Sequence, residues 1–311
     1  MTGWAGSPIP VTLLTTVTEP VVGAGWGVAA GRSVVVDGIS THLLEAGPAG
    51  GRPVLLLHGG AWGECAETAW APVLDRLAAR HRVIAPDLLG FGRTDKVRDF
   101  ADPLGRMLRH VRGLLDALDV DEVDAVGLSM GGTLLLRDLT GPAPLLPVRR
   151  LVLVSAGGAP IAPDVRAQLA DYDGTLESMR RQVALAFADP RWAADDEFVG
   201  ARHAMSLLPG AYEAFAANGL RAPGAPAGPP PEPDLSRVTV PTLVTAGTAD
   251  RLKAPGFAKP VADGLPDGRL REFDGAGHCP QIEAADEWTA AVLDFLAGSA
   301  DPAAPSDQEA P

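Results

Sequence analysis

The sequence is poor in cysteine, in positive charge and in long apolar runs. Only Cys65 and Cys279 occur among 311 residues, too few for a disulfide framework, and a reducing cytoplasm fits best. Lys and Arg number 26 against 39 Asp and Glu, and the net charge of −13 argues against nucleic acid or a membrane as partner. No apolar stretch reaches transmembrane length, and no basic start precedes an apolar segment. We therefore expect neither a membrane span nor a secretory signal.

Apolar runs of strand length alternate with amphipathic segments through most of the chain. Strands are predicted at RSVVVDG, STHLLEAG, RPVLLLHGG, HRVIAPDLLG, VDAVGLS, VRRLVLVSAGG, VPTLVTAGTAD and GRLREFDG. Helical spacing occurs in TAWAPVLDRLAAR, PLGRMLRHVRGLLDALDV and ADEWTAAVLDFLAG. Such alternation predicts an α/β fold with a parallel sheet covered by helices on both faces, where ligands bind at the carboxyl ends of the strands.

The alternation stops between about residues 159 and 235. TLESMRRQVALAFADPRW and DDEFVGARHAMSLLPGAYEAFAANG are amphipathic, with no strand between them, and predict a helical cap over the carboxyl edge of the sheet. A proline-rich linker, APGAPAGPPPEP, follows. The predicted core is therefore 31–158 and 236–297, and the cap with its linker is 159–235. Residues 1–30 are expected to form a flexible extension, and 298–311 a disordered tail.

Ser129 lies in a G-x-S-x-G pattern, from Gly127 to Gly131, between an apolar run and the helical segment TLLLRDL. A serine at a sharp strand-to-helix turn exposes its hydroxyl, and the flanking glycines let strand and helix approach each other. The helix start also places N–H groups where negative charge develops. A Gly-Ser turn without chemistry is the alternative, but the strand before it and the helix after it favour a nucleophile.

Of the six histidines, His278 is the one placed to act as a base. It follows the last predicted strand, in DGAGHCPQIE, whereas His58 is expected to brace its own loop. Asp250 ends the strand TLVTAGTAD and is predicted to orient His278, so that the chain order is Ser129, Asp250, His278. Asp274 is the alternative acid, and Asp250 as an ordinary turn residue is the alternative interpretation.

An oxyanion hole needs two backbone donors near the nucleophile. Met130 follows Ser129 and is predicted to supply one N–H. Gly60 in LLHGGAWG is predicted to supply the other, with Ala61 as the alternative. A glycine turn without this role is also compatible with LLHGGAWG.

Together the segments LLLHGG, VIAPDLLGFGRTD, VGLSMGG, TLVTAGTADRL and GAGHCPQIEAADEW resemble the α/β-hydrolase family, over roughly residues 33 to 297. The resemblance implies a mostly parallel eight-stranded sheet with helices on both faces and a helical cap insertion. A serine at position 129 excludes the dehalogenase and epoxide hydrolase branches, whose nucleophile is aspartate.

Within that family the chain looks most like the meta-cleavage product hydrolases, which cleave a C–C bond in vinylogous 1,5-diketones. LLDALDVDEVDAVGLSMGG, LESMRRQVALAFADPRWAADDEFVGARHAM and GHCPQIEAADEW carry this likeness. It implies that Arg202 in the cap holds the substrate's carboxylate or enol oxygens. A planar guanidinium suits that task, and a salt bridge with an acid of the cap is the alternative.

Two positions depart from that branch. Leu128 stands where the branch usually has Asn, and Cys279 where it usually has Trp. These changes put C–C specificity in question. Cys279 is expected to pack as a small apolar residue rather than react. The expected substrate contacts are Gly59, Ala61, Trp62, Leu128, Arg202 and Cys279.

The sequence thus predicts a serine hydrolase acting, with water, on a small or mid-sized apolar carbonyl compound, without metal or cofactor. C–C hydrolysis is one candidate reaction, and carboxylester, lactone or thioester hydrolysis is another. A cofactor-free lyase, cyclase or perhydrolase and a non-catalytic ligand receptor are further alternatives. A homodimer is left open.

Overall fold

One mixed sheet organises the residues that the computed structural model describes, namely 31–158, 161–220, 222–224 and 232–298. Its strands are Gly31–Val36 (β1), Ile39–Ala46 (β2), Arg52–Leu57 (β3), His81–Pro86 (β4), Val123–Leu128 (β5), Val148–Val154 (β6), Thr242–Gly247 (β7) and Gly268–Phe273 (β8). They lie in the order β1-β2-β4-β3-β5-β6-β7-β8. β2 pairs antiparallel with β1 and β4, and the other neighbours are parallel. The predicted mostly parallel eight-stranded sheet is confirmed.

The central strands are apolar because both of their faces are covered. Along β3, Leu55 and Leu57 pack on one face, and Val54 and Leu56 pack on the other. The Leu55 face is covered by Pro103–Ala117 (α2), Met130–Leu139 (α3) and Ala258–Asp263 (α9). The Val54 face is covered by Ala66–Ala78 (α1), Pro280–Glu283 (α10) and Ala285–Ala297 (α11). Each fully buried aliphatic side chain contributes about 2 kcal/mol to this core.

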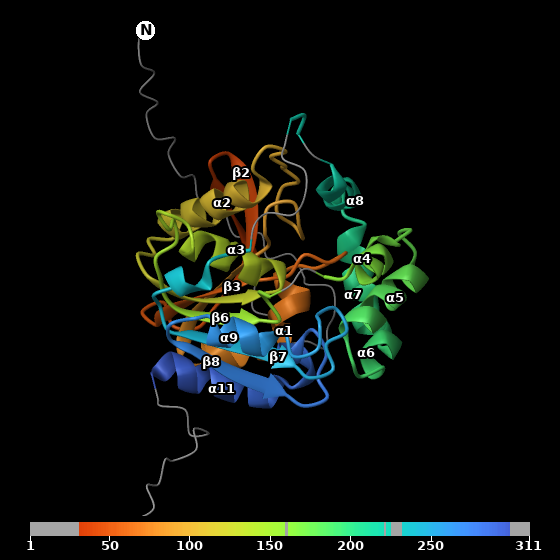
Figure 1. Ribbon diagram of the computed structural model, residues 1–311. Helices are drawn as coiled ribbons and strands as arrows, with labels where there is room; N and C mark the ends of the chain where they lie inside the picture. The colour runs from red at the N-terminus through yellow and green to blue at the C-terminus, as the bar shows by residue number, and fades with distance from the viewer. Residues whose placement is uncertain (1–30, 159–160, 221, 225–231, 299–311) are drawn as a thin grey trace, which may run out of the picture.

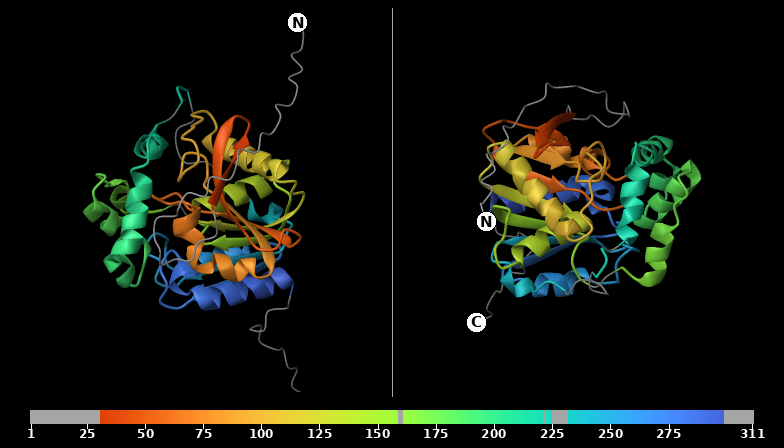
Figure 2. Two further views of the ribbon diagram at one scale, coloured as in Figure 1. Left: turned by 180° about the vertical axis from the view of Figure 1, so that it is seen from behind. Right: turned by 90° about the horizontal axis from the view of Figure 1, so that it is seen from above.

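Between β6 and β7 the described residues contain helices and no strand. The helices are Pro163–Ala170 (α4), Leu176–Ala186 (α5), Arg191–Ala194 (α6), Asp196–Ser206 (α7) and Ala211–Ala216 (α8), with two short 3-10 turns, Ala217–Gly219 and Leu235–Arg237. We call α4 to α8 the insertion helices. Figures 1 and 2 show them together on one side of the molecule, and the arrowheads of β7 and β8 point toward that side.

This arrangement supports the predicted division into a core and a cap, which remains a proposal. The predicted extension 1–30 and the tail beyond Gly298 lie outside the described residues, as do residues 225–231 of the linker. None of the helices within the described ranges is long and apolar enough to cross a bilayer.

Three glycines let α3 pack directly against the ends of β3 and β5. A Cβ atom on Gly127 would lie 2.5 Å from the backbone nitrogen of Gly132. A Cβ on Gly131 would lie 2.3 Å from the carbonyl oxygen of Leu57, and one on Gly132 would lie 2.3 Å from Cβ of Ala156. Because real Cβ atoms do not come this close to other heavy atoms, the turn between β5 and α3 requires glycine at these positions.

Gly131→Ala is therefore expected to lower the free energy of unfolding by about 3 kcal/mol, since the added methyl group collides with the main chain of β3. Chemical denaturation in urea measures this change. Gly200→Ala in α7 is the matched control, because a Cβ there meets nothing within 4 Å. That substitution should raise stability by up to about 1 kcal/mol. A Gly131 variant as stable as the unsubstituted protein would contradict the packing argument.

Candidate active site

Ser129 occupies the single position between β5 and α3, in a backbone conformation of positive φ, with φ 49° and ψ −106°. Its N–H donates to the carbonyl of Val154 on β6 (2.8 Å), and its carbonyl accepts the N–H of Thr133 in α3 (2.9 Å). A positive φ at a non-glycine residue costs about 1 to 3 kcal/mol and persists only where the surroundings enforce it. The turn therefore holds the half-buried serine at the carboxyl edge of the sheet.

Strain alone does not distinguish this serine. Ser155, at the end of the neighbouring strand β6, has the same φ of 49°. It is fully buried, and its hydroxyl has no hydrogen-bond partner among the described residues. Ser129 differs because it is partly exposed at the sheet edge and begins a helix.

Asp250 and His278 form a buried hydrogen-bonded pair, although they are far apart in the chain. Nδ1 of His278 lies 2.8 Å from Oδ2 of Asp250, and the two side chains are 6% and 3% exposed. The other oxygen of Asp250 accepts the N–H groups of Leu252 (2.8 Å) and Lys253 (3.3 Å). Burial alone would raise the pKa of Asp250, but His278 and these N–H groups outweigh it and lower that pKa. A charged Asp250 fixes the proton of His278 on Nδ1 and leaves Nε2 as an acceptor.

The alternative acid and the other strand-end histidine have different partners. Asp274 accepts a hydrogen bond from the hydroxyl of Thr248 (3.1 Å). Nδ1 of His58 lies 2.7 Å from the carbonyl oxygen of Gly59, and Nε2 accepts the N–H of Leu88 (2.9 Å). Burial lowers the pKa of His58 and favours the neutral ring. His58 thus links two loops, which agrees with the bracing role predicted for it.

The loop that carries His278 runs across the end of β7. A Cβ atom on Gly247, the last residue of β7, would lie 2.1 Å from the carbonyl oxygen of Ala276. Ser129 follows β5, which only β6 separates from β7, so the serine and the histidine share one edge of the sheet. The hydrogen bonds within the described ranges include none between Ser129 Oγ and His278.

Glu283 fixes this loop against the insertion helices. Its carboxylate accepts three backbone hydrogen bonds, from Gly277 (2.6 Å), Ala188 (2.9 Å) and Asp189 (2.9 Å). The N–H of His278 also donates to the carbonyl of Ala186 at the end of α5 (2.8 Å). Sequence reasoning missed Glu283. The signal available in the sequence was an acid in PQIE, only five residues after the predicted base. In the structure, burial raises the pKa of Glu283.

The predicted oxyanion donors lie side by side. A Cβ atom on Gly60 would be 2.7 Å from Sδ of Met130, so the glycine loop after β3 rests on the start of α3. The N–H of Ala61 donates to Oε2 of Glu64 (3.0 Å) and is therefore occupied. The N–H of Gly60 has no such partner in the part of the chain that the structure describes. These contacts favour Gly60 over Ala61 as the second donor.

Arg202 is buried against the same loop. Its Nη2 donates to the carbonyl oxygen of Trp62 (3.1 Å) and lies 3.8 Å from Oε2 of Glu64. Its Nε is buried without a hydrogen-bond partner among the described residues. Arg202 thus has an acid beside it, as the alternative interpretation expected, but the acid comes from the core and not from the cap. Sequence reasoning missed Glu64, a lone acid in the otherwise apolar stretch HGGAWGEC.

The remaining predicted contacts form an apolar wall between the core and the insertion helices. Leu128 and Cys279 are 1% and 3% exposed, in one cluster with Met179, Val183 and Phe198 of the insertion. Burial raises the pKa of the Cys279 thiol well above its usual value, as expected for an inert packing residue. Trp62 stacks on Phe215 and Tyr172, with ring centroids 3.8 and 4.7 Å apart, and its indole N–H donates to the carbonyl of Leu169.

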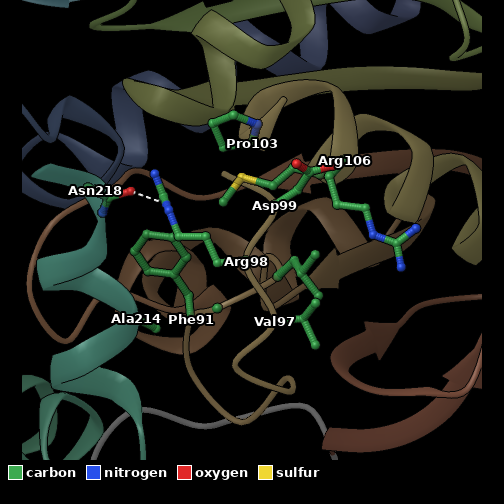
Figure 3. Close-up of a pocket in the computed structure, with 11 residues that line it drawn as sticks. Phe91, Val97, Arg98, Asp99, Pro103, Arg106, Ala214 and Asn218 are labelled. Carbon is green, nitrogen blue, oxygen red and sulfur yellow. Dashed lines mark hydrogen bonds between the residues drawn. The ribbon is translucent and has the colours of Figure 1, made fainter. Parts of the chain in front are cut away.

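A pocket lies beside this region, between the segment that follows β4 and the α8 end of the insertion (Figure 3). Figure 3 shows Arg98 reaching across to Asn218, with which it forms a hydrogen bond. Phe91 in the pocket wall packs edge-on against His58, with centroids 5.3 Å apart. None of the predicted site residues lines this pocket. No group of three His, Cys, Asp or Glu side chains within the described ranges is placed to hold a metal ion.

Both the sequence and the fold are similar to those of known proteins. Residues 54–292 match the model of the alpha/beta hydrolase family. The chain is 34% identical to a 2-hydroxymuconate semialdehyde hydrolase of Pseudomonas sp. strain CF600, over 86% of this chain and 94% of that one. It is also 34% identical to a 2-hydroxy-6-oxo-2,4-heptadienoate hydrolase of Pseudomonas putida, over 86% and 96%.

Among solved structures, a meta-cleavage product hydrolase of Pseudomonas fluorescens IP01 superposes with a TM-score of 0.76 at 26% identity, over 86% of this chain and 98% of that one. The resemblance inferred from the motifs is thus confirmed: the chain belongs to the α/β-hydrolase family and is a hydrolase similar to the meta-cleavage product hydrolases.

Proposed function

We propose that Ser129, His278 and Asp250 form a catalytic triad that hydrolyses an apolar carbonyl compound. The observation that carries this proposal is the 2.8 Å hydrogen bond between Asp250 and His278. It gives the imidazole a fixed tautomer and a counter-charge, and these are what a general base for a serine hydroxyl requires. The strained turn at Ser129, on the same edge of the sheet, supplies the matching nucleophile.

In the proposed reaction Ser129 Oγ attacks the carbonyl carbon while Nε2 of His278 accepts the hydroxyl proton. The N–H groups of Gly60 and Met130 hold the negative oxygen that develops. His278 then donates its proton to the leaving group, and water, activated by the same imidazole, releases the acyl group. The serine–histidine hydrogen bond is expected to tighten when substrate is bound, as is common for such pairs.

The relatives favour C–C bond hydrolysis as the reaction. The two relatives that are 34% identical are named as hydrolases of 2-hydroxymuconate semialdehyde and of 2-hydroxy-6-oxo-2,4-heptadienoate. On a vinylogous 1,5-diketone, the same residues would first assist ketonisation of the dienol. They would then cleave the carbon bond beside the carbonyl group.

Ester hydrolysis is the second candidate, and the polarity of the site favours it. Arg202 is next to Glu64 and is therefore not a free cation for a dienoate. Leu128 and Cys279 present apolar groups where the C–C branch usually has polar and aromatic ones. A small apolar acyl group fits such walls without a charged partner.

Ser129→Ala and His278→Ala are each expected to lower kcat by a factor of about 10³ to 10⁶, because the nucleophile or its base is lost. Steady-state kinetics measures the loss, and a fluorophosphonate probe should label only proteins that retain Ser129. Ser155→Ala is the matched control, since that serine has the same φ of 49° but is fully buried. It should keep both rate and labelling. Turnover at the original rate without Ser129 would refute the triad.

If C–C hydrolysis is the reaction, kcat/KM for a vinylogous 1,5-diketone should exceed that for a p-nitrophenyl ester of equal size. The comparison requires both substrates on one enzyme preparation, with products analysed in water enriched in heavy oxygen. A hydrolase places one heavy oxygen in the acid product. A higher kcat/KM on the ester would favour the second candidate, and a product without heavy oxygen would contradict hydrolysis.

A further inference from the structure

We propose that Glu64, not an acid group of the substrate, is the partner of Arg202, and that the carboxylate of Glu64 selects uncharged substrates. This inference deepens the proposed function and rests on it, because it takes Gly60 as part of the oxyanion hole. It agrees with the ester-hydrolysis candidate and opposes the C–C candidate, because the heptadienoate named for one relative is itself a carboxylate.

The carboxylate of Glu64 lies on the loop that carries the proposed oxyanion donor. It is 5% exposed, and its Oε2 accepts the N–H of Ala61 (3.0 Å). A Cβ atom on Gly59 would lie 2.9 Å from each of the two carboxylate oxygens. The negative charge therefore contacts the residues on both sides of Gly60. Left alone there, it would oppose the negative charge that develops on the substrate oxygen.

Arg202 is placed to neutralise this charge. Its Nη2 is 3.8 Å from Glu64 and is held in position by the carbonyl oxygen of Trp62. Helix α7 is pressed against the loop, since a Cβ on Gly63 would lie 1.9 Å from the carbonyl oxygen of Arg202. Both charges are buried, so neither is screened well by solvent. The pair makes the loop close to neutral overall.

A substrate carboxylate beside Arg202 would be a second anion next to this one cation, because the carboxylate of Glu64 is already there. Buried charges at contact distance interact strongly, so Glu64 would oppose such a group even where Arg202 attracts it. The neighbouring Leu128 and Cys279 are apolar and buried, and their side chains offer no strong hydrogen-bond donor to compensate. The site is thus complementary to a neutral chain and unfavourable to an acid of the same length.

The experiment compares p-nitrophenyl hexanoate with the mono-p-nitrophenyl ester of adipic acid, which has the same chain length but ends in a carboxylate. The proteins are the unsubstituted enzyme, Glu64→Gln, Arg202→Met and the double variant. Gln keeps an oxygen to accept the N–H of Ala61 and removes the charge, with an NH2 group in place of the second oxygen. Thermal unfolding of each protein accompanies the kinetics.

The unsubstituted enzyme should prefer the hexanoate in kcat/KM by about tenfold or more, and mainly through KM. Glu64→Gln should raise kcat/KM for the adipate by about tenfold relative to the hexanoate, because Arg202 then becomes a free cation. Arg202→Met alone should lower kcat on the neutral hexanoate, because Glu64 is left uncompensated beside the oxyanion. Adding Glu64→Gln to that variant should restore kcat, a coupling that loss of folding would not give.

Three results would overturn the inference. They are a preference of the unsubstituted enzyme for adipate, an unchanged ratio in Glu64→Gln, or a loss in Arg202→Met confined to adipate. The first needs no variant and holds even if the substituted proteins fail to fold. Failure of the proposed function has a different signature, since Ser129→Ala would then keep its rates whatever the substrate charge.

Discussion

The close approach of α3 to the ends of β3 and β5 is the constraint on which the rest of this structure depends. It is sterically allowed only because positions 127, 131 and 132 are glycine. The approach forces the intervening Ser129 into a conformation of positive φ. It also brings Met130 against Gly60, so that the first turn of α3 and the loop after β3 share one surface. The proposed nucleophile and the proposed oxyanion donors are thus positioned by the packing of one helix against the sheet.

Two buried pairs of charged or titratable side chains, Asp250 with His278 and Glu64 with Arg202, lie in the candidate site and differ in their geometry. Asp250 and His278 are joined by a short hydrogen bond, which suits a group that gains and loses a proton. Glu64 and Arg202 are 3.8 Å apart, and each has a further bond to the backbone of the Ala61–Trp62 segment. Burying such a pair costs desolvation energy that the attraction only partly offsets. Its position beside Gly60 gives a reason for keeping it that stability alone does not provide.

Much of the fold was predictable because its signals are local. The central strands of the sheet read as apolar runs followed by glycine or polar residues. The Ser, Asp and His of the proposed triad follow β5, β7 and β8. The helices α1, α2 and α11 also occur where the spacing of apolar residues predicts them. What decides these elements is side-chain periodicity within about fifteen residues, which a sequence shows directly.

The partners of the site residues were not predictable in the same way. Arg202 meets Glu64 because α7 folds back onto the loop after β3, and nothing in either segment specifies that distance. The three donors to Glu283 are backbone groups, which have no sequence signature. Sequence reasoning could propose an ion pair for Arg202, but the identity of the acid depends on tertiary packing.

Glu283 accepts hydrogen bonds from the backbone N–H groups of residues 188 and 189, not from their side chains. Any amino acid except proline can supply such an N–H group. The residues after α5 can therefore differ between homologues while the hydrogen bonds that connect this segment to the loop of His278 are kept. These hydrogen bonds also connect the end of α5 to the loop of His278, so that the two segments are expected to move together. A shift of α5 would therefore displace the loop of His278, the proposed base, through the three backbone hydrogen bonds to Glu283.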